Sequence, residues 1–303
     1  MRKTFINSLI ERARRDNRIH LIVADLGFSV VEDFAKEFPD RFLNAGISEQ
    51  NAAGVAAGMA LCGKIVYFFS IIPFVTMRCF EQVRVDLAYM NTNVRLVGVG
   101  AGYAYGPAGP THHAIEDLAI MRALPNMVIC APGDCVELKG ILEESYEHNG
   151  PMYIRLGKGG EGNIHNPDTL IKLGKGVPVT EGEDLILITT STMLEQGTRL
   201  VKELAGRGIR AALYSFHTLK PLDVELLNSL IKRKIPIITI EEHNIIGGLG
   251  SAVAEVIAES GYGIPFKRIG VPDIYTHSIG SQDYLRRQVI FRGDLLEVLG
   301  IKK

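Results

Sequence analysis

Short apolar segments alternate along this chain with longer segments of helical period, and this alternation constrains the fold more than any other feature. In the first half, the apolar runs are bounded by Gly, Pro, Asp or Asn and favour strands; they are His20–Ala24, Ile65–Ser70, Val94–Val99, Met127–Ala131 and Met152–Leu156. The helical segments between them are Ser48–Cys62, Val75–Met90, Ile115–Ala123 and Asp134–His148. Strands that alternate with helices predict a parallel sheet with helices on both faces.

A second set of the same kind follows a change in composition. From Gly157 to Asp184 the chain is polar and rich in glycine, which is typical of a connection between domains. The strands expected after it are Leu185–Thr189, Ala211–Tyr214, Pro236–Ile240 and Pro265–Arg268, and the helices are Met193–Gly206, Asp223–Arg233 and Gly250–Ser260. Because 303 residues exceed the usual size of one domain, we predict an α/β protein with two open-sheet α/β domains.

Composition and charge exclude several classes of protein. A net charge of −1 provides no basic field for nucleic acid or for an anionic membrane. No stretch approaches the length of a membrane span, and residues 1–16 hold no apolar run long enough for an export signal. The four cysteines form no CxxC pair and lie in or beside apolar runs, which favours buried, reduced thiols. We therefore expect a cytoplasmic protein.

The first candidate for chemistry is Glu49, which stands just before a helix made almost only of Ala, Gly, Val and Met. In a purely structural interpretation, Ser48 caps this helix and the helix dipole favours a carboxylate in the first turn. The small residues of the helix, however, indicate that it is buried closely against something. A carboxylate at the mouth of such a helix can hold a strong hydrogen bond, which a cofactor that must shift its tautomer needs.

Two glycine-rich segments are further candidates. The loop from Gly98 to His113 follows the carboxyl end of a strand, where open α/β sheets place ligands. His112 and Glu116 could share a helix face as metal ligands, but no third ligand is evident, so we expect no metal site. The segment Gly247–Val253 is similar to a dinucleotide fingerprint, yet a long turn separates it from its strand, and close packing of a helix is the favoured interpretation.

Segments along nearly the whole chain together resemble the C-terminal half of transketolase. They are ADLGFS, FPDRFLNAGISEQNAAGVAAGMA, FEQVRVDLAYMNTNV, GPTHHAIEDLAIMRALPNM, GPMYIRLGK, KPLD and EEHNIIGGLGSAVAEV. The chain is especially similar to the separate C-terminal subunits of split transketolases, and also to deoxyxylulose-phosphate synthase. The resemblance implies a thiamine-diphosphate pyrimidine-binding domain over residues 1–160, a linker over 161–182 and a transketolase C-terminal domain over 183–303.

The resemblance also implies how the cofactor is held and used. The glutamate at the position of Glu49 hydrogen-bonds N1′ of the aminopyrimidine of thiamine diphosphate and favours its imino tautomer. Phe74 matches an aromatic residue that stacks on this ring, while Ile71 stands where a second aromatic residue is usual, and Gln50 is expected beside the cofactor. His112 matches the histidine that contacts the donor's hydroxyl groups and reactive centre. The activity implied is transfer of a two-carbon ketol unit from a ketose to an aldose, with the electrons carried by the cofactor.

The substrate contacts implied by the resemblance are less complete. Arg2 and Ser29 match residues that hold the substrate phosphate. Lys158 stands where an arginine is usual, and lysine keeps the charge but loses the bidentate fork. An aspartate that reads a sugar hydroxyl falls at Ala108, and a phosphate-contacting histidine falls near Gly100. Because buried polar groups discriminate by what they leave unpaired, their loss predicts an unusual sugar.

We expect two tyrosines of the altered loop to supply replacement contacts. They are Tyr103 and Tyr105, and only their place in the loop motivates this expectation.

The motif that binds magnesium and the cofactor's diphosphate in this family is absent from the sequence. It consists of GDG followed by asparagines, and the nearest string here is Pro132–Cys135, which begins a helix. We therefore expect that an N-terminal transketolase subunit with the GDG…N motif holds Mg²⁺ and the diphosphate. The chain would then be active only with this partner, in an α2β2 assembly.

Two other functions stay open from the sequence. One is a deoxyxylulose-phosphate-synthase-like or 2-oxo-acid dehydrogenase β-type subunit, which would release carbon dioxide from pyruvate. The other is a non-catalytic paralogue that acts as a partner or regulatory module, which the changes at Gly100 and Ala108 would permit. Retention of Glu49, Phe74 and His112 argues against the second function, because a scaffold has no need of a carboxylate that faces an apolar pocket.

Overall fold

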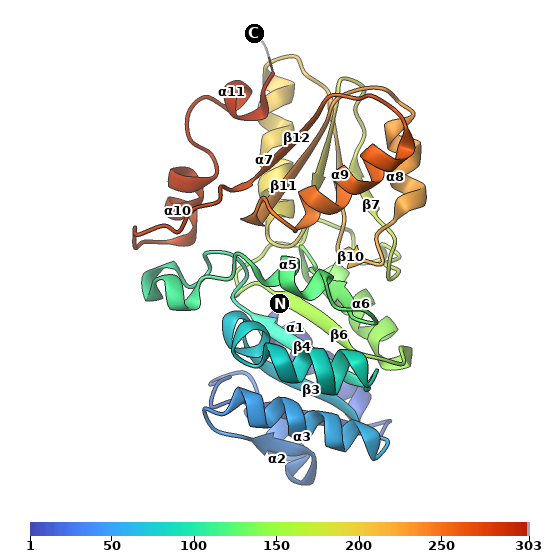
Figure 1. The fold of residues 1–303 in the computed structure, drawn as a ribbon, viewed down its shortest axis with the longest axis vertical. Coiled ribbons are helices and arrows are strands. Elements are labelled where there is room, and N and C mark those ends of the chain that lie inside the picture. Colours follow the sequence, from blue (N-terminus) through green and yellow to red (C-terminus); the bar gives the residue numbers. More distant parts are fainter. Residues whose placement is uncertain (302–303) are drawn as a thin grey trace.

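The computed structural model describes residues 1–301 and contains two sheets, one above the other (Figure 1). The first sheet has seven strands in the order β10-β5-β6-β4-β3-β1-β2. They are β1 (Ile19–Val23), β2 (Phe42–Asn44), β3 (Ile65–Ile71), β4 (Val94–Val99), β5 (Val128–Cys130), β6 (Met152–Leu156) and β10 (Thr218–Lys220). All neighbours pair in parallel except β10, which runs antiparallel to β5.

Helices cover both faces of the first sheet. One face carries α1 (Arg2–Ala13) and α6 (Cys135–Glu147), whose apolar side chains share a core with those of β1 and β3. The other face carries α3 (Glu49–Leu61), the π-helices η2 (Phe74–Arg78) and η3 (Val83–Tyr89) with the short α4 (Phe80–Gln82) between them, and α5 (Asp117–Arg122). The remaining helices of this half are α2 (Glu32–Glu37) and the 3₁₀ turns η1 (Pro39–Arg41), η4 (Gly106–Ala108) and η5 (Pro110–His112).

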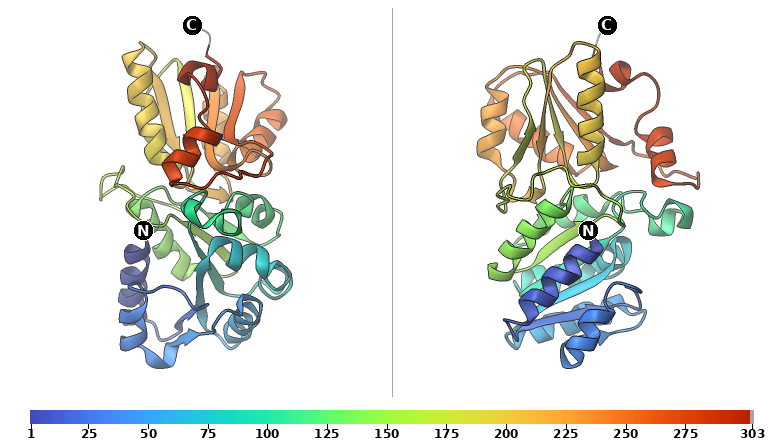
Figure 2. Two further views of the ribbon diagram at one scale, coloured as in Figure 1. Left: turned by 90° about the vertical axis from the view of Figure 1, so that its left-hand side faces the viewer. Right: turned by 180° about the vertical axis from the view of Figure 1, so that it is seen from behind.

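The second sheet has five strands in the order β12-β11-β8-β9-β7. They are β7 (Val177–Thr180), β8 (Leu185–Thr189), β9 (Ala211–Ser215), β11 (Ile237–Asn244) and β12 (Phe266–Val271). The helices are α7 (Met193–Gly206), α8 (Val224–Ile231), α9 (Leu249–Ser260), α10 (Gln282–Val289) and α11 (Leu295–Leu299). α7, α10 and α11 lie on one face of the sheet and α8 and α9 on the other, as the turned views in Figure 2 also show.

The predicted fold class, α/β with two open sheets, is confirmed. The segment expected as one helix from Val75 to Met90 differs from the prediction, because it consists mainly of the two π-helices. Ser48 was expected to cap α3, but its hydroxyl instead donates to the Ala45 carbonyl oxygen at 2.6 Å, and its side chain caps no backbone N–H. Asp134 does cap α6, since its carboxylate accepts from the N–H groups of Val136 and Glu137.

Two short strands connect the halves in a way that the sequence pattern did not indicate. β7 lies in the expected glycine-rich connection and pairs antiparallel with β9. β10 belongs to the second half of the sequence but joins the first sheet at β5. Strands of three or four residues are too short to show a period, so neither could be recognised beforehand. The boundaries at residues 160 and 183 stay a prediction.

A buried arginine joins the two halves from the inside. Arg155 of β6 is fully buried and forms an ion pair with Asp117, at 2.8 Å from its Nε to the carboxylate. It also donates to the Ser191 hydroxyl and to the Glu242 carbonyl oxygen, both in the second half. A buried guanidinium needs all of these acceptors, because each unpaired N–H in the interior is costly. The contacts therefore hold the carboxyl end of the first sheet against the second domain.

Candidate active site

Glu49 is a buried carboxylate at the mouth of α3. Its exposed fraction is 2%, and its Oε2 accepts a hydrogen bond from Nη1 of Arg78 at 2.7 Å. Within residues 1–301, this is the only hydrogen bond to the carboxylate, so Oε1 has no donor. Burial, with the charge of Glu49 beside it, raises the pKa of the Cys79 thiol to about 12. The surroundings of Glu49 are therefore poorly hydrated, as a site for strong hydrogen bonding requires.

Aromatic and basic side chains extend from Glu49 across the carboxyl edge of the sheet. The guanidinium of Arg78 lies over the ring of Phe74, with 4.0 Å from Cζ to the ring centroid. The ring of Phe74 meets that of His112 edge-on at 5.2 Å, and His112 meets Tyr105 at 6.2 Å. We call this set of five residues, Glu49, Arg78, Phe74, His112 and Tyr105, the edge row. It brings together three predicted site residues that lie far apart in the sequence.

Tyr105 fills space that Gly100 leaves open. A Cβ atom on Gly100 would lie 2.3 Å from Cε2 of Tyr105, and Gly100 has a φ of +99°, which favours glycine. Nζ of Lys158 stands 4.8 Å from the centroid of the same ring. Burial raises the pKa of the Tyr105 hydroxyl, with the charge of Arg2 opposing this, so the phenol stays neutral at neutral pH.

The predicted phosphate contacts lie at the far end of the edge row. Lys158 is exposed, and Arg2 is half-buried near Gly159, whose Cβ would stand 3.9 Å from Nη2 of Arg2. Both cations are therefore near Tyr105. Ser29 is exposed with a φ of +61°, and its N–H donates to the Glu32 carboxylate at 2.6 Å. Within residues 1–301, no hydrogen bond joins Ser29 to the other predicted residues, so its role stays a prediction.

The other predicted positions differ in their surroundings. Ile71 is half-buried at the end of β3, and Gln50 is exposed beside Glu49. Tyr103 was expected to contact the substrate, but it is fully buried against His113 and its N–H donates to the Glu242 carboxylate. Tyr103 is therefore part of the support of the loop, and Tyr105 is the tyrosine that reaches the edge row. Arg78 was not predicted, because its only signal in the sequence is its spacing of four residues from Phe74.

The second domain holds the loop that carries Tyr105 and His112. Gly102 pairs with Ala114, which closes the base of the loop. A Cβ on Gly106 would lie 2.3 Å from the Gly280 carbonyl oxygen, so the loop packs directly on the segment before α10. The position of two members of the edge row thus depends on contacts with the second half of the chain.

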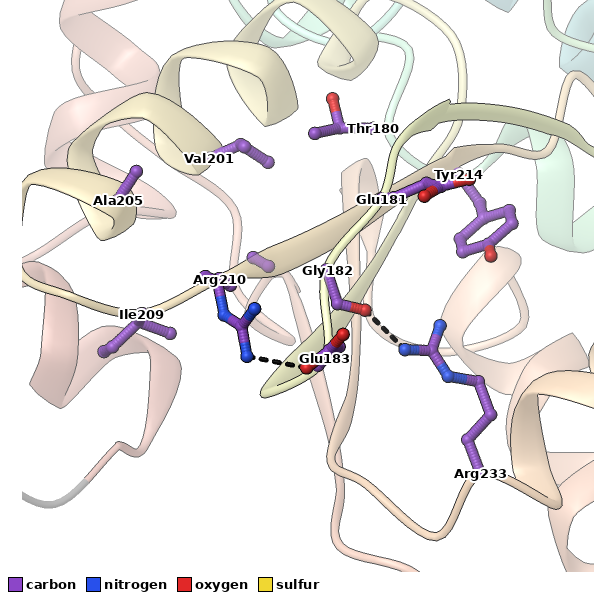
Figure 3. A pocket seen from close by; sticks show the side chains of 11 residues that line it. Thr180, Glu181, Gly182, Glu183, Val201, Ala205, Ile209, Arg210, Tyr214 and Arg233 are labelled. Carbon is purple, nitrogen blue, oxygen red and sulfur yellow. Dashed lines mark hydrogen bonds and ion pairs between the residues drawn. The ribbon is translucent and has the colours of Figure 1, made fainter.

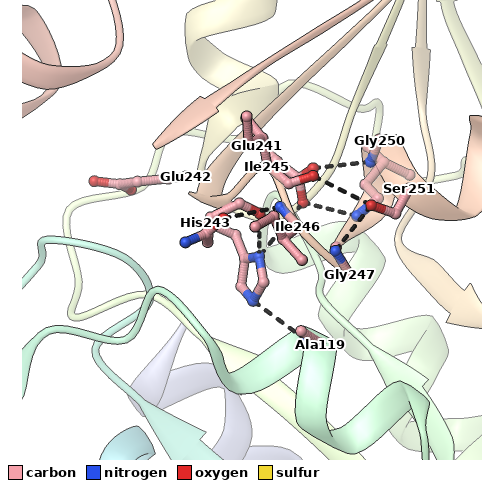
Figure 4. Close-up of polar contacts among 12 residues, drawn as sticks. Ala119, Glu241, Glu242, His243, Ile245, Ile246, Gly247, Gly250 and Ser251 are labelled. Carbon is pink, nitrogen blue, oxygen red and sulfur yellow. Dashed lines mark hydrogen bonds and ion pairs between the residues drawn. The ribbon is translucent and has the colours of Figure 1, made fainter. Parts of the chain in front are cut away.

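The glycine-rich turn before α9 packs a helix closely, as predicted. The Glu241 carboxylate accepts from the N–H groups of Leu249 and Gly250 at 2.7 and 2.8 Å, so a side chain of this protein already takes the anion position at the helix N-terminus (Figure 4). His243 accepts from the Ala119 N–H and donates through Nδ1 to the Asn244 carbonyl oxygen, and burial lowers its pKa to about 4.

A hollow of about 600 Å³ in the second domain is a different kind of feature (Figure 3). It lies beside the amino ends of β8 and β9, opposite to the end where open sheets bind ligands. Its charged groups are paired locally, since Arg210 bonds to Glu183 and Arg233 donates to the Gly182 carbonyl oxygen. We therefore place the functional site at the edge row.

His112 and Glu116 do not share a helix face. His112 ends the turn η5, whereas Glu116 directly precedes α5, and the extended His113 lies between them. In the described part of the chain, no group of three or more His, Cys, Asp and Glu side chains is arranged to hold a metal ion. No helix among residues 1–301 is both long and apolar enough to cross a membrane.

The fold and the edge row define a two-domain α/β protein whose site combines a buried carboxylate with a neighbouring aromatic ring. Models of known families place this protein further. Residues 1–160 match the transketolase pyrimidine-binding domain, and residues 174–291 match the transketolase C-terminal domain. The chain belongs to the transketolase family, whose members use thiamine diphosphate.

Relatives of similar length are separate sections or subunits. The chain is 39% identical to a putative transketolase C-terminal section of Methanocaldococcus jannaschii, over 94% of this chain and 90% of that protein. It is 37% identical to a subunit of the apulose-4-phosphate transketolase of Phocaeicola vulgatus, over 90% and 87%. A 1-deoxy-D-xylulose-5-phosphate synthase of Aquifex aeolicus is 35% identical over 94% of this chain, but the match covers 45% of that protein.

A solved structure agrees in fold over nearly the full length. It is a split-gene transketolase described as an inactive β4 tetramer, with a TM-score of 0.86, 39% identity and coverage of 94% of this chain and 92% of that one. A transketolase of Pichia stipitis is 19% identical with a TM-score of 0.78, which shows the shared fold.

Proposed function

We propose that this chain is the C-terminal subunit of a two-subunit transketolase that transfers a two-carbon ketol unit from a ketose to an aldehyde. The observation that carries the proposal is the buried Glu49 carboxylate, which has a free Oε1 and lies beside the aromatic ring of Phe74. Names of relatives with matching length support the subunit assignment, since they include single subunits of apulose-4-phosphate transketolases.

The residues of the edge row fit the aminopyrimidine of thiamine diphosphate. Glu49 can accept a hydrogen bond from a ring nitrogen through Oε1, and Phe74 offers a flat apolar face for stacking. When bound, the cofactor supplies the nucleophilic carbon and the electron sink of the reaction. Glu49 holds a proton at the ring nitrogen, in surroundings where water competes poorly, and His112 is placed to contact substrate hydroxyl groups.

At the far end of the row, we assign the substrate's anionic end to Lys158 and Arg2. Tyr105 and Ala108 form the wall where the resemblance predicts polar groups, so the sugar is expected to be an unusual one.

A partner subunit is expected to cover the loops around Glu49. Phe28 and Ile47 lie on loops that follow β1 and β2, and their exposed fractions are 82% and 77%. These loops are joined, because the Asp25 N–H donates to the Asn44 side chain at 3.0 Å. Large apolar side chains exposed beside a candidate site are typical of a protein interface. We assign Mg²⁺ and the diphosphate to this partner, in an α2β2 assembly, and place the assembly in the cytoplasm because all four cysteines are free thiols.

Substitution of Glu49 tests the proposal. In the pair reconstituted with its N-terminal subunit, Glu49→Gln should lower ketol transfer by about 100-fold or more, because proton transfer by a positioned group contributes at least that much. Circular dichroism should show unchanged folding. Glu81→Gln, which changes an exposed carboxylate paired with Arg84, is the matched control and should retain activity. Ketol transfer by the Glu49→Gln pair at the wild-type rate would refute the assignment.

The same assay separates transketolase from the alternatives. Cleavage of a ketose without release of carbon dioxide supports transketolase, whereas carbon dioxide released from added pyruvate would identify a synthase-like or 2-oxo-acid dehydrogenase-type subunit. A reconstituted pair that binds no thiamine diphosphate would identify a non-catalytic module.

A further inference from the structure

Arg78 makes two contacts that the proposed function gives to the aminopyrimidine. Its guanidinium lies over the ring of Phe74 with 4.0 Å from Cζ to the centroid, which is a stacking distance. Its Nη1 donates to Oε2 of Glu49 at 2.7 Å. One flat group of this chain thus stacks on the aromatic ring and hydrogen-bonds to the carboxylate at the same time.

The chemical character of the guanidinium also matches that of a protonated aminopyrimidine. Both are planar, carry delocalised positive charge and present N–H donors in their plane. A carboxylate with an exposed fraction of 2% is costly to keep charged without a partner, and Arg78 supplies that partner in the free chain.

Arg78 is built to move, whereas Glu49 is not. Its side chain is 42% exposed, so the guanidinium can turn into water without breaking a core. Its backbone ends η2, a π-helix of five residues, and π-helical segments often occur at functional sites. The spacing within η2 places Phe74 and Arg78 side by side, which lets the guanidinium reach the ring.

We propose that Arg78 occupies the place of the aminopyrimidine in the free chain and must leave it when thiamine diphosphate binds. Arg78 thereby lowers the affinity of the subunit pair for the cofactor, because binding must first break the ion pair with Glu49 and the stack on Phe74. The inference rests on the proposed function, since it assumes that Glu49 and Phe74 receive the cofactor.

The affinity of the reconstituted pair for thiamine diphosphate with Mg²⁺ tests the inference by isothermal titration calorimetry. Arg78→Met keeps much of the side-chain length but removes the charge and the planar group, so the dissociation constant should fall at least fivefold. Arg84→Met, which removes an exposed guanidinium paired with Glu81, is the matched control and should leave the constant unchanged. Arg78→Lys keeps the charge without the flat group and should give an intermediate value.

Opposite results have separate meanings. If the wild-type pair binds the cofactor and Arg78→Met binds it equally or more weakly, Arg78 does not compete with the ring and the inference fails while the proposed function stands. If neither pair binds thiamine diphosphate, both fail.

The free chain provides a second readout that needs no cofactor. Arg78→Met should lower its thermal unfolding midpoint by several degrees, because Glu49 loses its partner, but should have little effect in a Glu49→Gln background. An equal effect of Arg78→Met in both backgrounds would show that the ion pair is not what Arg78 contributes, and would overturn the inference.

Discussion

At the scale of single residues, the contact between Gly100 and Tyr105 shows how a loop adapts its site. The ring of Tyr105 takes the space that a side chain at position 100 would fill. Tyr105 in turn supports His112 and carries Lys158 on its face. The glycine is therefore a condition for the position of two polar groups that we assign to the substrate.

Gly100→Ala should displace Tyr105 and impair the enzyme. The new Cβ would lie 2.3 Å from the ring at a φ of +99°, so both overlap and backbone strain are introduced. We expect a loss of about 1–3 kcal/mol in the free energy of unfolding, measured by urea denaturation, together with a raised KM for the sugar donor.

Gly109→Ala is the matched control for Gly100→Ala. Gly109 has a φ of +78° with no atom within 4 Å of a new Cβ, so its substitution introduces the strain without the overlap. Equal effects of the two substitutions on KM would contradict the role of Tyr105.

The residues of the site were predictable to different degrees. Glu49, Phe74 and His112 stand in segments whose pattern is distinctive, and the structure brings them into one row. The choice between Tyr103 and Tyr105 could not be made, because glycines with positive φ interrupt any regular alternation in the loop. Arg78 was missed because the π-helical spacing of η2 does not follow the period of an α-helix.

At the scale of elements, α9 depends on a carboxylate from the neighbouring strand. Glu241 of β11 is fully buried, and burial raises its pKa to about 7 although it accepts two backbone N–H groups of α9. A Cβ on Gly248 would lie 2.0 Å from Oε2 of Glu241, so the glycine allows this close approach. Strand, turn and helix therefore form one unit.

Glu241→Ala should destabilise this unit strongly. Two N–H groups of the first turn of α9 would lose their acceptor in the interior, which corresponds to about 1–3 kcal/mol in the free energy of unfolding. Urea denaturation measures the loss. Glu255→Ala, on the same helix but 59% exposed, should change this free energy by less than about 1 kcal/mol. A difference between the two variants near zero would show that Glu241 is not the cap of α9.

The elements themselves were predictable where they were long and periodic. α7 and β4 have the expected bounds, and the other predicted strands mostly differ by a few residues at their ends. β7 and β10 were missed because three or four residues carry too little pattern, and their pairing is decided by distant partners.

At the scale of the whole molecule, a cluster of ionisable groups lies where α6 meets the chain that leads to the second domain. Asp134 and Glu137 of this cluster lie at the start of α6, and His165 stands between them at 3.0 and 3.6 Å. Burial raises the pKa of Glu137 to about 7, whereas burial lowers that of His217 to about 4. The two groups have opposite effects on the dependence of stability on pH.

The sign for Glu137 follows from the proton balance. Its ordinary pKa is 4.5, so between pH 4.5 and 7 the folded chain keeps a proton that the unfolded chain releases. Its contribution to stability is complete below pH 4.5 and is lost as the pH rises through 7. His217, whose ordinary value is 6.5, contributes the reverse trend, with stability lost as the pH falls through about 4.

Glu137→Gln should therefore remove part of the loss of stability between pH 5 and 7.5. Glutamine keeps an oxygen for the Gly133 N–H but has no proton to release. Free energies of unfolding measured in urea across this range should fall less steeply, by on the order of 1–3 kcal/mol in total. Glu144→Gln, at an exposed position of the same helix, should keep the wild-type slope. A Glu137→Gln slope equal to that of the wild type would contradict the assignment.

The place of β10 has a consequence for how such proteins can be recombined. The strand is encoded with the second family domain but completes the edge of the sheet in the first. A chimaera joined within the glycine-rich connection would take this strand from one parent and the β5 edge from the other. The two domains are thus separable as names but not as interchangeable cassettes, and residues 218–220 must be inherited together with the edge they cover.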